Sequence, residues 1–173
     1  MSDVERAIAR FYRLAEADPE GRSLGYHRAL VTKVRELAPD AGVALVLAAA
    51  CQHLERWTLP RDRFPADVLG YKRWRSELAR FHARRAAEEL AALGFAPETI
   101  ARVGELLQKK RLGTDPEVQL FEDAICLVFA ERELPAFAAK HPPEKVRVIL
   151  DKTLAKMSDD GRARLSASLA RQA

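Results

Sequence analysis

The spacing of apolar residues along the chain is helical almost throughout. Near the N-terminus, Val4, Ile8 and Phe11 recur three or four residues apart, as one face of a helix requires. Segments of the same period follow, and most are bounded by Pro, Gly or a capping residue. The pattern predicts helices at residues 4–14, 30–37, 43–57, 71–93, 97–113, 116–129, 143–154 and 158–169. We find no alternating strand pattern, so we expect an all-α fold.

One predicted connection is longer than the others. Residues 58–70 contain Pro60, Pro65 and Gly70, and a loop of this length inside a compact helical domain is usually functional or disordered. We therefore expect a single-domain helical bundle of about seven or eight helices with a long loop near residues 58–70. Residues 1–157 form the expected domain, and residues 158–173 a short C-terminal helix or tail.

The composition narrows the class of protein. The chain has 173 residues, 48% apolar and 31% charged, which is ordinary for one globular domain and excludes disordered, collagen-like and disulfide-scaffold chains. The longest apolar run, residues 42–51, is too short to cross a bilayer, and no export signal is visible. Cys51 and Cys126 lie in apolar helical stretches and are expected to be free thiols. These features favour a cytoplasmic location without membrane contact.

Basic residues are concentrated in one segment. The net charge is +4, and residues 56–75 alone hold six bases against two acids, together with Trp57 and Trp74. A second basic cluster contains Lys109 and Lys110. Basic groups beside aromatic rings suit phosphates and bases. The alternative interpretation is a solvated, arginine-rich helix surface.

Several ionisable residues are predicted to face the helical interior. A buried carboxylate or imidazole needs a polar partner. One solution is convergence on a divalent cation such as iron, manganese or zinc, whereas the other is separate pairing of each group within the core. Glu122 is expected to be a surface carboxylate, or else to contact the metal ligands without binding the metal itself. The four candidate metal ligands, each on a different predicted helix, are His27, His53, His82 and Asp123.

The order of these residues resembles that of the HD-domain superfamily, whose members are all-helical, metal-dependent phosphohydrolases. The resemblance implies that His27 is the first ligand, His53 the histidine of the His-Asp doublet and Asp123 the last carboxylate. His82 matches a further histidine that holds a second metal or the substrate in some members. Leu54 occupies the position of the doublet aspartate and cannot bind a cation. The resemblance therefore also allows a scaffold that has lost its metal and kept the pocket.

A closer resemblance covers most of the chain, from about residue 4 to residue 157. The strings HLERW at 53–57, GYKRWR at 70–75 and DPEVQ at 115–119 are similar to an uncharacterised bacterial and fungal domain-of-unknown-function family (DUF4202-like). This resemblance implies the fold and brings no reaction. The sequence contains no glycine-rich phosphate loop, Cys-x-x-Cys or His-Glu-x-x-His motif.

Two functions follow from these observations. The first is an HD-like metal-dependent phosphohydrolase, in which the metal activates water for attack on a nucleotide-like or other phosphorylated substrate. The alternative is a metal-free helical module that binds a nucleotide, RNA or another anionic partner. For either function, the expected partner is a phosphate-containing small molecule, and nucleic acid is the alternative partner. The expected substrate-binding residues are Arg56, Arg61, Lys72, Arg75, Lys109, Lys110, Trp57 and Trp74.

Overall fold

The computed structural model describes residues 1–172, and none of these lies in a strand. The predicted all-α class is therefore confirmed. Within the same range, no helix is both long and apolar enough to cross a membrane. The helices are α1 (Asp3–Ala15), α2 (Ser23–Leu37), α3 (Val43–Cys51), α4 (Val68–Ala92), α5 (Pro97–Leu107), α6 (Pro116–Arg132), α7 (Leu134–Ala138), α8 (Pro143–Leu154) and α9 (Asp159–Gln172).

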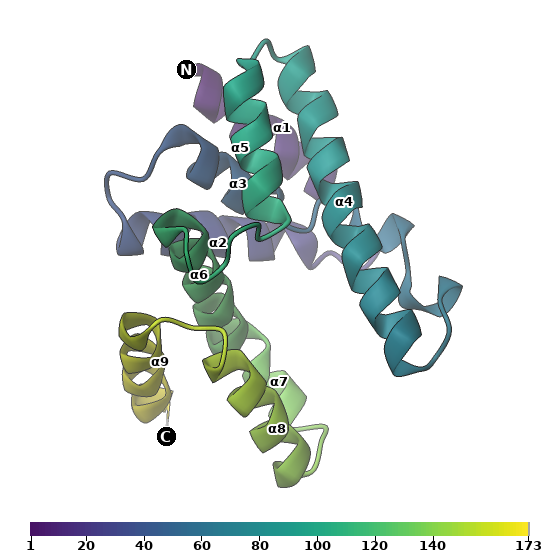
Figure 1. The fold of residues 1–173 in the computed structure, drawn as a ribbon, viewed down its shortest axis with the longest axis vertical. Helices are drawn as coiled ribbons and strands as arrows, with labels where there is room; N and C mark the ends of the chain where they lie inside the picture. Colours follow the sequence, from purple (N-terminus) through teal and green to yellow (C-terminus); the bar gives the residue numbers. More distant parts are fainter. Residues whose placement is uncertain (173) are drawn as a thin grey trace.

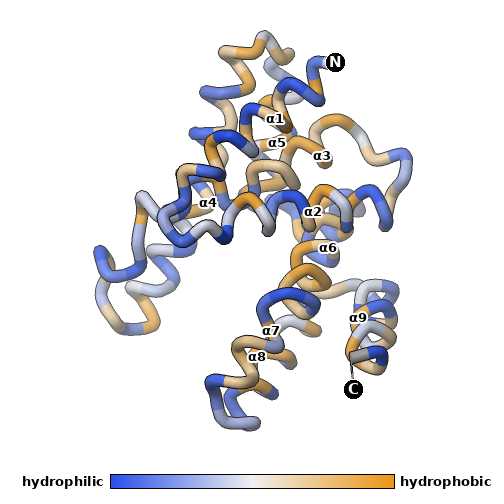
Figure 2. Tube along the Cα trace, turned by 180° about the vertical axis from the view of Figure 1, so that it is seen from behind, coloured by the Kyte–Doolittle hydropathy of each residue, from blue (hydrophilic) through white to orange (hydrophobic). Residues whose placement is uncertain are grey.

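Helix α3 forms the centre of the main core. Its residues from Leu45 to Cys51 are all buried, because a helix that is apolar on every side must be covered on every side. Helices α1, α2 and α5 pack around it, and α4 lies against the outer side of α5. Figure 2 shows hydrophobic segments gathered where these helices meet. The main core thus fixes the C-terminal end of α3 against α2 and α5.

A second, smaller hydrophobic cluster joins the C-terminal helices. Leu127 of α6, Leu134 of α7 and Leu165 of α9 are buried in it, together with Met157. Figure 1 shows α6 running from the upper helices down to α7, α8 and α9. Residue 173, the last of the expected C-terminal tail, lies outside the described residues.

The segment between α3 and α4 differs from the prediction. Helix α3 ends at Cys51, not near residue 57, and the chain leaves the helical path at Glu55, whose φ is +51°. Two 3-10 turns follow, η1 (Arg56–Thr58) and η2 (Arg61–Arg63). Helix α4 begins at Val68, capped by the preceding aspartate, so the irregular segment ends earlier than predicted.

The loop before α4 is packed against the helix that it precedes. A Cβ atom at Gly70 would lie 2.1 Å from the carbonyl oxygen of Pro65, so only glycine permits this approach. Arg61 donates a hydrogen bond to the Phe64 carbonyl at 2.9 Å. The loop is therefore a folded extension of α4.

Candidate functional site

Three histidines from separate segments lie together beneath the loop. His27 is on α2, His53 is in the turn that follows α3, and His82 is on α4. The backbone N–H of His53 donates to Nε2 of His27 at 3.1 Å. The ring centroids of His53 and His82 are 5.8 Å apart. The ring of Tyr26 stacks on that of His53 at 4.6 Å, which fixes the orientation of this imidazole.

Burial keeps these imidazoles neutral. The pKa of His27 is lowered to about 4 because its side chain is fully buried. Burial, reinforced by the charge of Arg56, lowers the pKa of His82 to about 3. The pKa of His53 lies well below its usual range for the same two reasons. Near neutral pH, each ring therefore offers one N–H donor and one nitrogen acceptor.

Asp123 does not join the histidines, contrary to the expectation. Its carboxylate accepts hydrogen bonds from the backbone N–H of Ser158 at 2.9 Å and from the amide of Gln119 at 3.2 Å. A Cβ atom at Gly161 would lie 2.6 Å from the Asp123 Cγ, so this carboxylate packs directly against the start of α9. The N–H and hydroxyl of Ser158, just before the N-terminus of α9, therefore supply hydrogen-bond donors to this buried carboxylate.

The residues present do not fit the expected metal centre. In the described part of the chain, no group of three or more His, Cys, Asp or Glu side chains is placed to hold a metal ion. Nε2 of His27 already accepts the His53 N–H. Leu54, at the position of the doublet aspartate, is fully buried in the main core. No carboxylate therefore completes a ligand set with the histidines.

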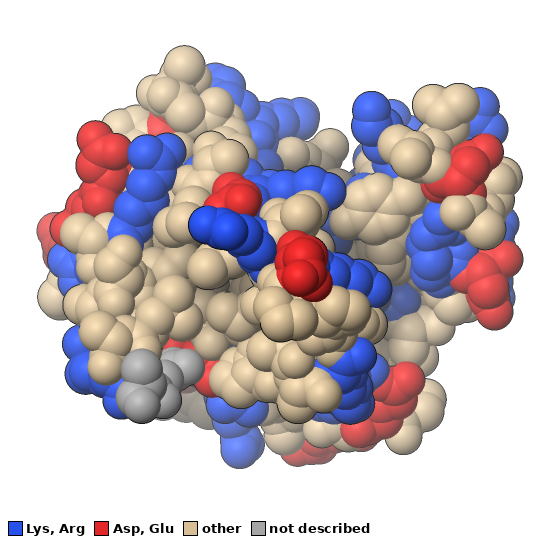
Figure 3. Space-filling model, turned by 90° about the horizontal axis from the view of Figure 1, so that it is seen from below, with Lys and Arg blue, Asp and Glu red and all other residues tan. Residues whose placement is uncertain are grey.

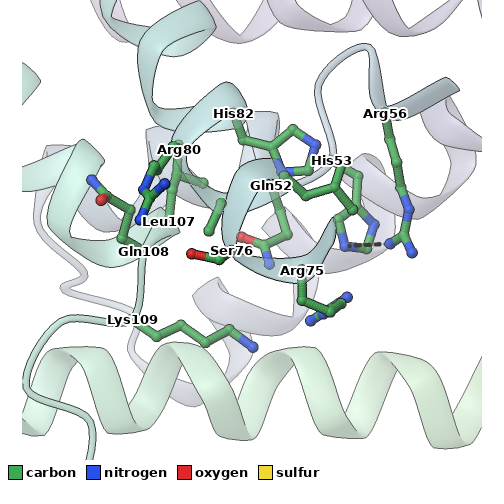
Figure 4. Close-up of a pocket in the computed structure, with 12 residues that line it drawn as sticks. Gln52, His53, Arg56, Arg75, Ser76, Arg80, His82, Leu107, Gln108 and Lys109 are labelled. Carbon is green, nitrogen blue, oxygen red and sulfur yellow. Dashed lines mark hydrogen bonds between the residues drawn. The ribbon is translucent and has the colours of Figure 1, made fainter. Parts of the chain in front are cut away.

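A cavity of about 420 Å³ opens beside His53 and His82. Figure 4 shows it between the end of α3, the middle of α4 and the turn that follows α5. Its lining is mainly polar and combines cationic side chains, neutral imidazoles, amides and a hydroxyl. The polar lining residues are Gln52, His53, Arg56, Arg75, Ser76, Arg80, His82, Gln108 and Lys109.

Two arginines of this cavity have no carboxylate partner. Among residues 1–172, no Asp or Glu oxygen lies within salt-bridge distance of Arg56 or Arg75, and Glu133 acts on Arg56 only at longer range. Burial and the positive charge of Arg75 lower the pKa of the Arg56 guanidinium. The pair therefore places positive charge at the cavity without a carboxylate partner among the described residues.

Arg56 is held in place by neutral groups. Its guanidinium lies 5.1 Å from the ring centroid of Trp74, and its NH1 is 3.2 Å from Nε2 of His53. The indole N–H of Trp74 donates to the Leu59 carbonyl at 2.9 Å, which ties the ring to the loop. One face of the Trp74 ring therefore supports an arginine, and Trp74 does not line the cavity.

The other cations of the cavity are paired. Lys109, whose φ is +53°, forms an ion pair with Glu122 of α6. Glu122 is only 1% exposed, so the expectation of a surface carboxylate is wrong. Arg80 pairs with Glu77 at 2.9 Å on the exposed side of α4. The charges of Lys109 and Arg80 are therefore compensated by carboxylates, whereas Arg56 has no carboxylate partner among residues 1–172.

The remaining predicted substrate-binding residues do not line the cavity. Arg61 instead braces the loop through backbone carbonyls. Lys72 and Lys110 are exposed, and Trp57 is half-buried beside the loop. Of the eight residues expected from the sequence, the structure brings Arg56, Arg75 and Lys109 to the cavity.

Sequence reasoning missed the neutral polar residues of the site. Gln52 is 6% exposed, and its Oε1 has no hydrogen-bond partner among the described residues. Ser76 and Gln108 also line the cavity. The sequence did contain an indication for Gln52, because it is a polar residue at the end of an otherwise apolar helix.

The cations that line the cavity are Arg56, Arg75, Arg80 and Lys109. Figure 3 shows a hollow that separates two parts of the molecule. One part contains the start of α4, and the other contains the remaining helices. Lys and Arg side chains lie on both sides of the hollow. A negatively charged molecule approaching this face meets a favourable potential, which raises its local concentration.

Comparison with known proteins identifies one family. A family model described as "Domain of unknown function (DUF4202)" matches residues 5–172. This match confirms the closer of the two resemblances noted in the sequence. A search of curated proteins and a search of solved structures gave no match.

Proposed function

This chain belongs to the DUF4202 family, whose description assigns no activity, and we propose that its histidine–arginine cavity binds a phosphate-bearing small molecule. The observation that carries the proposal is the pair Arg56 and Arg75, which line the cavity without a carboxylate partner among residues 1–172. A phosphate group supplies the missing negative charge.

The chemistry of the pair suits a phosphate oxyanion. Guanidinium groups donate two parallel hydrogen bonds to phosphate oxygens, and such charge-assisted bonds are about twice as strong as neutral ones. Trp74 and His53 already orient Arg56, so little side-chain entropy is lost on binding. Since each arginine repels the other, an anion between them also relieves this repulsion.

Metal-free binding is better supported than metal-dependent hydrolysis. An HD-like hydrolase requires a carboxylate beside the histidines, whereas Asp123 contacts Ser158 and Leu54 is buried. The cavity volume of about 420 Å³ favours a small molecule over a nucleic acid strand. The proposed setting is the cytoplasm, where phosphorylated metabolites are abundant.

Isothermal titration calorimetry with inorganic phosphate tests the proposal. Arg56→Gln and Arg75→Gln should each weaken phosphate binding about 10- to 100-fold, the effect of losing a charge-assisted hydrogen bond. Arg73→Gln is the matched control, because Arg73 is also exposed on α4 but does not line the cavity. Its affinity should stay within about twofold of the wild type at physiological salt.

Two results would contradict the proposal. One is the absence of phosphate binding by the wild-type chain, and the other is an equal loss of affinity in all three variants, which would show a diffuse charge effect. Elemental analysis of protein purified without a histidine tag tests the alternative function, the metal-dependent hydrolase. Stoichiometric iron, manganese or zinc that is lost in His53→Ala would favour the metal-dependent function.

A further inference from the structure

We infer that the ligand is a phosphorylated sugar or polyol, and that Gln52 and His82 bind its hydroxyl groups. The inference rests on the proposed phosphate site and adds the chemistry of the rest of the ligand. It starts from polar atoms of the cavity that the arginines do not explain.

Two buried polar side chains of the cavity are left without partners. Gln52 is 6% exposed and His82 is 5% exposed. Neither Oε1 of Gln52 nor Nε2 of His82 has a hydrogen-bond partner among the described residues. Figure 4 shows the Gln52 amide in the middle of the lining residues. An unpaired buried polar atom costs about 1–3 kcal/mol, so these atoms favour a ligand that satisfies them.

A phosphate group alone does not satisfy Oε1 of Gln52. An amide oxygen accepts hydrogen bonds only, and the phosphate of a monoester near neutral pH consists almost entirely of acceptors. A hydroxyl group both donates and accepts, so it satisfies Gln52 in either orientation of the amide and His82 in either neutral tautomer. Ser76 and Gln108 provide further donor–acceptor groups in the same cavity.

The cavity offers little to a nucleobase. None of the described lining residues is Phe, Tyr or Trp, so a base in the cavity would stack only on an imidazole or a guanidinium. The ring of Trp74 carries the Arg56 guanidinium, and one face of His53 is covered by Tyr26. A volume of about 420 Å³ is sufficient for a sugar phosphate.

Calorimetric titrations with inorganic phosphate, ribose 5-phosphate and AMP test this inference. Ribose 5-phosphate should bind at least about tenfold more tightly than inorganic phosphate, as one or two satisfied buried groups predict. AMP carries the same sugar and phosphate plus a base, and it should bind no more tightly than ribose 5-phosphate.

Gln52→Leu assigns the effect to the amide. In the variant, ribose 5-phosphate should bind little more tightly than inorganic phosphate, because the contact with the amide is lost. The affinity for inorganic phosphate should stay within about twofold of the wild type. Ser76→Ala gives a second readout that does not depend on core packing, because Ser76 is exposed. It should weaken ribose 5-phosphate about three- to tenfold and leave inorganic phosphate unchanged.

The possible failures are distinguishable. If inorganic phosphate binds but ribose 5-phosphate binds no more tightly, the phosphate site stands and the inference about hydroxyl groups is wrong. If AMP binds tenfold more tightly than ribose 5-phosphate, the ligand is recognised by its base and the inference is again wrong. If none of the three binds, the proposed function and this inference both fail.

Discussion

Asp123 and Glu122 are adjacent carboxylates on α6 with different partners. Asp123 is 7% exposed and is compensated by Ser158 at the start of α9, whereas Glu122 is 1% exposed and is compensated by Lys109 at the cavity. Each partner lies on a different segment of the chain. Adjacent residues on a helix point about 100° apart, so a single turn of α6 connects the C-terminal helix to one side and the cavity to the other.

Replacing Asp123 should affect stability and leave ligand binding intact. Asp123→Ala leaves the N–H of Ser158 without its acceptor, so the free energy of unfolding should fall by about 1–3 kcal/mol. Urea denaturation measures this change. Asp160→Ala, at an exposed position of α9, should cost no more than about 0.5 kcal/mol. A loss of phosphate affinity without a loss of stability would instead place Asp123 in the binding site.

The histidines were predictable from the sequence, whereas the partner of Asp123 was not. His27 and His82 lie on apolar faces of strongly periodic helices, so their burial follows from the pattern alone. Asp123 has the same kind of apolar neighbours, but Ser158 is 35 residues farther along the chain. Helical periodicity shows which face of a helix is buried and does not show which distant segment covers it.

Helices α5 and α6 are joined through the cap of α6. Asp115 accepts hydrogen bonds from the backbone N–H groups of Glu117 and Val118 at 3.1 and 3.3 Å. The guanidinium of Arg102, on α5, binds both oxygens of this carboxylate, at 2.8 and 2.9 Å. These contacts hold the pKa of the Asp115 carboxyl well below its usual range, with Arg102 the largest cause.

The stability contributed by Asp115 should depend on pH. Because its pKa is depressed in the folded chain, the contribution is complete above the unfolded pKa of about 4 and is lost as the pH falls through the folded pKa. Asp115→Asn should lower the unfolding free energy by about 1–2 kcal/mol at pH 7 and by less at pH 3. Urea denaturation at both pH values measures the difference. Asp159→Asn, at a fully exposed ion pair, should show no such dependence.

At the level of elements, long helices were easier to predict than helix ends. The predicted helix at residues 71–93 corresponds closely to α4, because the apolar face is continuous and the glycine that follows is a clear stop. The end of α3 was missed because Leu54 and Trp57 continue the helical period beyond Cys51, although the helix ends there and the backbone turns at Glu55. Helix α7 was missed because five residues contain too little of a period to detect.

The molecule as a whole contains two hydrophobic clusters of unequal size. The main core joins α1 to α6, whereas the smaller cluster holds the C-terminal helices to the end of α6. Within the described chain, α8 contains no fully buried residue. Since local stability follows buried apolar contact, the C-terminal helices should open without unfolding of the main core.

Amide hydrogen exchange measures this difference. Amides of α8 should exchange at least about 100-fold faster than those of α3, which corresponds to a difference of about 3 kcal/mol in opening free energy. Ribose 5-phosphate should slow exchange in α4 and at the end of α3, and leave α8 unchanged. Equal protection of α3 and α8 would show that the chain unfolds as a single unit.

The approach of Pro65 to Gly70 has a consequence for how the cavity would bind the proposed phosphate ligand. Because the loop is folded onto α4 in the free protein, the backbone positions of Arg56 and Arg75 relative to each other are set before any ligand arrives. Binding then requires no ordering of chain, and the entropic penalty that lowers the affinity of mobile loops is largely absent. Under the proposed function, the selectivity of the cavity would arise from shape and charge that exist before the encounter with the phosphate ligand.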